Sequence, residues 1–167
     1  MKIKDIINKV KFIYPEIRDD ETIIKLYNLV ILDLTSYFPL IEEEYFDLKE
    51  VKYNKFKKRV RAIIDCQNSK YKVYPQCVKS MNKQPLGKIK YHYIPATPTS
   101  IEDECEYNKS FLQIIVFGIC AEYCITIADF DNAVLWHQRQ TRLCDSREEA
   151  VKIWNRRGAS NENIDNI

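Results

Sequence analysis

The chain has 167 residues and carries 26 Lys and Arg against 24 Asp and Glu, a net charge of +2; that length fits one domain with room for an insertion. With only three Gly and two His, glycine-rich phosphate loops and a metal site built from several histidines of one chain are excluded. No apolar run reaches the ~18 residues of a membrane-spanning helix, and the first five residues contain no apolar signal core. We therefore expect no membrane segment and no secretory signal.

Two helices open the chain. Apolar residues recur at helical spacing over residues 3–13, and Pro15 ends that helix. The acidic residues of segment 19–22 mark the start of a second helix, which runs to about Phe38 and is stopped by Pro39. Its predicted buried stripe is Ile23, Tyr27, Val30, Ile31 and Leu34.

The middle of the chain alternates as strands do. Residues 51–56 predict a weak strand and residues 59–65 a second one, with 71–74 as its hairpin partner across the turn at 67–69. Residues 88–94 alternate so that Ile89, Tyr91 and Tyr93 share one face, opposite Lys88, Lys90, His92 and Ile94. A small antiparallel sheet of three or four strands is expected.

Helices return after an extended linker at 95–100. Residues 107–128 predict a strongly apolar helix, in which Gly118, Ala121 and Cys124 are small enough for close helix approach. The next helix begins at Asp129 and reaches about Leu143. A short charged helix is expected over residues 146–157, before a polar end.

The predicted fold class is therefore α+β, a helical bundle from the N- and C-terminal helices with a small antiparallel β-insertion. Its predicted parts are an N-terminal helical hairpin (1–45), a basic β-insertion (46–95), C-terminal helices of the same domain (96–157) and a disordered tail (158–167).

The charge is distributed unevenly along the chain. Residues 1–50 carry −4, residues 51–91 carry +11 and residues 92–167 carry −5. Basic strands interleaved with tyrosines can bind nucleic acid through phosphate contacts and stacking. Equally, such a pattern suits the solvated face of a half-exposed sheet. The candidate DNA- or partner-facing residues are Lys55, Lys57, Lys58, Arg59, Arg61, Lys70, Lys72, Lys88 and Lys90.

No catalytic or metal-binding constellation is recognisable. The six cysteines include no Cys-x-x-Cys pair and are expected to be free thiols. His92 has no Ser, Cys or Asp partner at an interpretable spacing, and His137 is interpreted as a surface or interface histidine. Segment 42–44 (Glu-Glu-Glu) is interpreted as a solvated loop, since three adjacent carboxylates do not converge on one metal ion. We expect neither a cofactor nor an enzymatic activity.

Several stretches resemble a known family. They are the opening residues 1–10, Tyr14-Pro15 and 19–23, then segment 91–96 (Tyr-His-Tyr-Ile-Pro-Ala), 117–124 (Phe-Gly-Ile-Cys-Ala-Glu-Tyr-Cys) and 129–136 (Asp-Phe-Asp-Asn-Ala-Val-Leu-Trp). Together they resemble the head–tail connector proteins of tailed bacteriophages, across most of residues 1–143. The strongly basic insert and the part beyond Asp145 depart from that family's pattern.

The resemblance implies a structural virion protein of the neck, made in the host cytoplasm, with no active site. Proteins of this family form a ring, commonly of twelve copies, that docks beneath the portal protein, meets tail or further neck proteins and extends the DNA channel. Non-specific contact with genomic DNA and no contact with a membrane are then expected. The C-terminal residues predicted to dock onto the portal or a neighbour are Arg147, Lys152, Trp154, Arg156 and Arg157. The alternative function is a stand-alone nucleic-acid-binding module that uses the basic, Tyr-rich insert.

Overall fold

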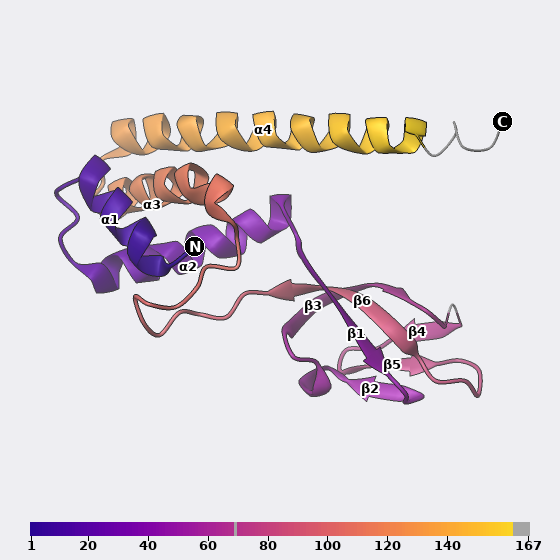
Figure 1. Cartoon of the computed structure of the whole chain (residues 1–167). Coiled ribbons are helices and arrows are strands. Elements are labelled where there is room, and N and C mark those ends of the chain that lie inside the picture. Colours follow the sequence, from indigo (N-terminus) through magenta and orange to yellow (C-terminus); the bar gives the residue numbers. More distant parts are fainter. Residues whose placement is uncertain (69, 162–167) are drawn as a thin grey trace. The chain divides into compact units, whose positions relative to one another are not determined.

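The computed structural model of the chain describes residues 1–68 and 70–161, with side chains described as far as Glu149. The chain divides into two compact units, which we describe separately (Figure 1). The helical unit consists of Met1–Val30 and Ser100–Ile167, and the sheet unit consists of Ile31–Thr99. The prediction of a mixed fold, with helices at both ends and antiparallel strands between them, is confirmed.

Helices α1 (Ile3–Ile13) and α2 (Asp20–Tyr37) form where the sequence predicts them. The apolar face of α1 is buried, and the five residues of the predicted stripe on α2 are all at most 4% exposed. Asp19 caps α2, because its carboxylate accepts hydrogen bonds from the backbone N–H of Thr22 (2.8 Å) and of Glu21 (3.3 Å). The N-terminus pairs with the segment that returns from the sheet unit: the N–H of Ile3 donates to the carbonyl of Asp103 (2.9 Å).

Helix α3 (Leu112–Thr126) follows the 3-10 turn η2 (Lys109–Phe111) and packs against α1 and α4 (Figure 1). Gly118 lies at a close approach of three helices. A Cβ atom placed on it would lie 2.6 Å from Nε2 of Gln140 on α4 and 2.7 Å from Cγ1 of Val30 on α2. The prediction that small residues allow close helix approach is therefore confirmed at Gly118.

The sequence analysis excluded every membrane-spanning segment, but a helix among the described residues is long and apolar enough to qualify. Within the part of the chain that the structure describes, one segment, Lys109–Thr126, is long and apolar enough to cross a membrane by length and composition, with a mean hydropathy of 1.4. Half of that segment is buried inside the protein, and Ile114, Ile115, Val116 and Ile119 are at most 3% exposed. The core helix of a folded domain passes the same test, because its apolar side chains face other helices.

Helix α4 (Phe130–Asn161) is one continuous helix where the sequence predicted two. It lies alongside α3 and continues beyond it (Figure 1). The segment around Asp145 contains no proline or glycine that would break it. The helix also passes Gly158, where the disordered tail was expected to begin, and residues 162–167 of that expected tail lie outside the described residues.

The sheet unit contains two antiparallel sheets of three strands each. One has the order β1 (Leu40–Phe46), β6 (Gly87–Ile94), β3 (Arg59–Cys66), and the other has the order β2 (Glu50–Lys52), β5 (Cys77–Ser80), β4 (Tyr71–Val73). Strand β6 is central, and its burial alternates as predicted: Ile89, Tyr91 and Tyr93 are buried while Lys88 is exposed. These three residues join one apolar core with Val51, Phe56, Cys66, Val78 and Leu86.

Four predictions for this unit were wrong. The unit holds two sheets of three strands each, where one small sheet of three or four strands was expected. Segment 42–44 is not a loop, because it forms the centre of β1 and pairs with β6. Strand β4 is not the hairpin partner of β3, since β3 pairs with β6 and β4 pairs with β5, a strand that was not predicted. The expected strand at 51–56 is only β2 followed by the 3-10 turn η1 (Tyr53–Lys55).

Candidate nucleic-acid interface

Four of the nine candidate basic residues lie together between β2 and the first residue of β3. Residues 55–59 (Lys-Phe-Lys-Lys-Arg), which we call the basic loop, hold these four cations and one apolar residue, Phe56. Phe56 is 7% exposed and its ring packs 4.8 Å from the rings of both Phe46 and Tyr91. The apolar side chain thus anchors the loop in the core of the sheet unit and leaves the cations around it at the surface.

Hydrogen bonds hold the backbone around this loop. The N–H of Tyr53 donates to the carbonyl of Gln76 (3.0 Å), and the hydroxyl of Tyr53 donates to the carbonyl of Tyr74 (3.0 Å). On the other side, the N–H of Lys57 donates to Oε1 of Glu44 on β1 (2.9 Å). The loop is therefore tied to both neighbouring parts of the sheet unit.

Glu44, which the sequence analysis interpreted as part of a solvated loop, belongs to this arrangement. Its carboxylate also accepts a hydrogen bond from the hydroxyl of Tyr91. Burial, together with that bond, raises the pKa of Tyr91, so its hydroxyl keeps its proton and remains a donor at neutral pH. The arrangement could not be foreseen, because Glu44 and Tyr91 meet only through the pairing of β1 with β6.

The basic loop borders a surface hollow of about 430 Å³. Tyr53, Asn54 and residues 56–60 line it, so it presents two lysines, an arginine, an amide and a phenol ring, and no carboxylate. Among the described residues, the side chains of Lys55, Lys57 and Arg59 form no ion pair. The ammonium group of Lys58 lies 5.2 Å from the centre of the Tyr93 ring.

The lysines of β6, in contrast, are paired with a carboxylate. Lys88 lies 2.5 Å from the carboxylate of Glu43 and Lys90 lies 3.9 Å from it, across the register of β1 and β6. The hydrogen bond from Lys88 lowers the pKa of Glu43, so this carboxylate stays charged at neutral pH. Both lysines therefore share a compensating negative charge, which the sequence analysis had placed in a separate loop.

The remaining candidates lie elsewhere on the unit. Arg61 on β3 donates to the hydroxyls of Thr35 (2.9 Å) and Ser36 (3.2 Å) at the end of α2, so it fixes structure inside the sheet unit. Lys70 and Lys72 are exposed at β4, and the ammonium group of Lys72 lies 5.4 Å from the centre of the Tyr74 ring. The nine candidates thus do not form one uniform surface.

The net charges of the two folded units differ from the net charges of the three sequence segments. The sheet unit holds 13 Lys and Arg against seven Asp and Glu, a net charge of +6 rather than the +11 of segment 51–91. The helical unit holds 13 Lys and Arg against 17 Asp and Glu, a net charge of −4. The difference arises because the sheet unit also includes residues 31–50, which carry a net charge of −5, three of their acidic residues lying on β1.

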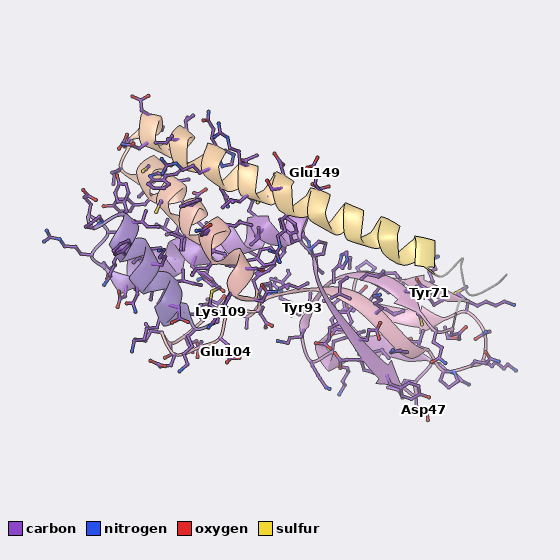
Figure 2. All side chains as sticks on the ribbon, turned by 45° about the horizontal axis from the view of Figure 1, so that its top comes forward. Asp47, Tyr71, Tyr93, Glu104, Lys109 and Glu149 are labelled. Atoms are coloured by element: carbon purple, nitrogen blue, oxygen red, sulfur yellow. The ribbon has the colours of Figure 1, made fainter. Side chains whose placement is uncertain are left out.

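The C-terminal docking candidates all fall on α4. The guanidinium of Arg147 stacks on the ring of Phe111 at 3.8 Å, a contact within the helical unit. Figure 2 labels Glu149, the last residue of α4 whose side chain is described, so the side chains of Lys152, Trp154, Arg156 and Arg157 lie outside the described residues. Their docking role stays a prediction.

The remaining His, Cys, Asp and Glu side chains are the candidate metal ligands and thiols. Within the ranges that the structure describes, no three His, Cys, Asp or Glu side chains converge to hold a metal ion. The cysteines of these ranges are free thiols. Burial raises the pKa of Cys120 to about 12 and also raises the pKa of Cys66 and Cys105, which keeps these thiols protonated.

No protein-family model matches the chain, and no match is found among curated proteins.

Proposed function

We propose that the chain is a structural head–tail connector protein of a tailed bacteriophage, which assembles as a ring between the portal and the tail and extends the DNA channel. The observation that carries this proposal is the separation of charge into a sheet unit of +6 and a helical unit of −4. In a ring, each copy meets its neighbour through two different surfaces. Unlike charge on those surfaces favours head-to-tail contact over the pairing of like surfaces.

The residues that carry the resemblance act in packing, which also supports a role in assembly. Gly118 allows three helices to approach, and Cys124 is buried on the same helix. Trp136 packs 5.5 Å from Phe117 and 6.5 Å from Tyr14, with the guanidinium of Arg139 over it at 4.6 Å. These contacts all lie within the helical unit, and we propose that the protein is a structural protein and not an enzyme.

Exposed apolar side chains offer surfaces for other chains. At the turn between α3 and α4, Ile125, Ile127, Phe130 and Val134 are 50–63% exposed. On the sheet unit, Tyr45 of β1 is 70% exposed. Patches of this kind are typical of protein contacts. The proposed partners are further copies of this chain, twelve by the resemblance, the portal protein above and tail or neck proteins below.

The proposal also covers where the protein is located and how its helices are arranged. We place the protein in the neck of the virion, after synthesis in the host cytoplasm. We further propose that α1, the first part of α2, α3 and α4 act together as the helical bundle that the sequence analysis expected.

Assembly is tested with the portal protein of the same genome. The purified chain is mixed with portal particles, and the complex is sedimented at low and high salt. We expect co-sedimentation in a fixed ratio, weakened by salt because attraction between unlike charges is screened over about 10 Å at 0.1 M. A chain that stays monomeric and never sediments with the portal contradicts the proposal.

The second candidate, a stand-alone nucleic-acid-binding module, is favoured by Lys55, Lys57 and Arg59 of the basic loop, which form no ion pair among the described residues. It predicts salt-dependent binding of free DNA or RNA by a chain that neither forms a ring nor binds the portal. The sedimentation experiment and a DNA titration therefore separate the two functions.

A further inference from the structure

We infer that the basic loop is a binding site for the phosphodiester backbone of a nucleic acid, and that the lysines of β6 are not part of it. The inference rests on the proposed function only for the source of the nucleic acid, the DNA that passes through the connector. It divides the basic segment, which the sequence treated as one surface, into a binding part and a structural part.

The division follows from the ion pairs. A cation that is already paired with a carboxylate gains little from a phosphate, because the phosphate must compete with the existing partner. Lys88 and Lys90 share Glu43, and Lys79 lies 3.4 Å from Glu50. Among the described residues, Lys55, Lys57 and Arg59 have no such partner. Their charge is therefore available to a polyanion.

The backbone of the loop is held before any ligand arrives. Phe56 is fixed in the core, Tyr53 is bonded to the carbonyls of Gln76 and Tyr74, and the N–H of Lys57 is bonded to Glu44. A loop that is already ordered loses less conformational entropy on binding. The carboxylate of Glu44 accepts hydrogen bonds from two donors of its own unit, the N–H of Lys57 and the hydroxyl of Tyr91, and Glu44 does not line the hollow.

The hollow itself suits a phosphate with its flanking sugars. Its volume of about 430 Å³ lies in the range of small-molecule sites, and its lining combines cations with the amide of Asn54 and the phenol of Tyr53. Lysine and arginine bind phosphate oxygens by charge-assisted hydrogen bonds. Because no acidic residue lines the hollow, nothing in it repels an anion.

A second contact continues from the hollow. The hydroxyl of Tyr53 is bonded to the carbonyl of Tyr74, a residue whose side chain is 37% exposed and lies beside Lys72. The pair of Lys72 and Tyr74 is therefore joined to Tyr53 of the hollow through the backbone of Tyr74. Aromatic rings beside a basic groove bind bases by stacking. Aromatic rings beside the cations, Tyr53 in the hollow and Tyr74 with Lys72, favour nucleic acid over an acidic protein surface as the ligand.

Two triple variants with the same change in charge test the inference. Lys55→Gln/Lys57→Gln/Arg59→Gln removes three unpaired cations, and Lys79→Gln/Lys88→Gln/Lys90→Gln removes three paired ones. Fluorescence anisotropy is measured with a labelled oligothymidylate and a labelled DNA duplex at several salt concentrations. Thermal melting by circular dichroism confirms that each variant is folded.

We expect the loop variant to bind on the order of 100-fold more weakly at 0.1 M salt, and its salt slope to fall by about 2 to 3, because each phosphate contact contributes about 0.7 to 0.9 to that slope. The paired-lysine variant is expected to change affinity less than about five-fold. If the parent protein binds the oligothymidylate more tightly, the ligand is single-stranded nucleic acid; if it binds the duplex more tightly, the ligand is double-stranded DNA. Either result supports the inference.

Three outcomes overturn the inference. Equal losses of DNA affinity in the two variants would reflect net charge alone, and DNA binding by the parent protein that does not depend on salt would exclude phosphate contacts. Unchanged DNA binding by a loop variant that no longer sediments with the portal would make the loop a protein contact. Whether the chain sediments with the portal in the absence of DNA does not depend on these binding results. The sedimentation assay therefore tests the proposed function, and the anisotropy titrations test the inference.

Discussion

Replacing Gly118 by alanine tests the helix packing most sharply. The added Cβ would lie 2.6 Å from Nε2 of Gln140 and 2.7 Å from Cγ1 of Val30, where van der Waals contact requires about 3.5–4.0 Å. The amide of Gln140 ends a flexible side chain and can move away. Val30 is 4% exposed and β-branched, so it has little rotamer freedom and α2 must shift instead.

The magnitude follows from two opposing effects. Overpacking a core costs about 1–3 kcal/mol, and alanine gains about 1 kcal/mol over glycine in a helix. We therefore expect Gly118→Ala to lower the free energy of unfolding by up to about 2 kcal/mol, and Gly118→Leu to lower it further. Urea denaturation followed by circular dichroism measures both.

A double-mutant cycle identifies the cause. Val30→Ala should cost at least about 1 kcal/mol less in the Gly118→Ala background than in the parent, because it removes the overlap, whereas Gln140→Ala should couple to Gly118→Ala by less than about 0.5 kcal/mol. If Gly118→Ala stabilises the protein by the full helix-propensity gain, the close approach of α2 and α3 described above is wrong.

Three further predictions concern the sheet unit and the cysteines. Gly87 has a φ of +69°, so Gly87→Ala should lower the free energy of unfolding by about 1–2 kcal/mol in urea melts, and an unchanged midpoint would contradict this. Tyr91→Phe should cost about 1.5–3 kcal/mol, because it removes the hydrogen bond to Glu44. Since the pKa of Tyr91 is raised in the folded state, stability should fall as the pH rises above 10, the usual pKa of tyrosine, and less so in the variant. Burial raises the pKa of Cys120 to about 12, so iodoacetamide at pH 8 should modify the half-buried Cys77 and spare Cys120, as read by mass spectrometry; comparable rates would refute that burial.

Local patterns predicted the elements whose burial is periodic. Helix α1 and strand β6 each show one period along their whole length, so the sequence placed both and assigned the buried face of β6 correctly. Strand β1 was missed because its three glutamates were read as solvated. In the folded chain Glu43 faces the lysines of β6, while Glu44 bonds with Tyr91, and the aromatic pair Tyr45 and Phe46 was the signal for a strand.

Pairing between distant strands could not be predicted. The turn at 67–69 favoured a β3–β4 hairpin, yet β3 pairs with β6, and this choice depends on long-range packing of the core. For the same reason, the basic segment was expected to be uniform. Its division into paired and unpaired cations depends on the register that brings Glu43 beside Lys88 and Lys90. Composition gave the charge of each segment, but only the fold determines which charges remain available.

The central claim, that the protein is a ring-forming connector, is tested most directly by electron microscopy of the purified chain mixed with the portal of the same genome. The account predicts a second ring beneath the portal, coaxial with it and with an open channel. Portal particles that carry no added density at saturating concentrations of a folded chain would contradict it.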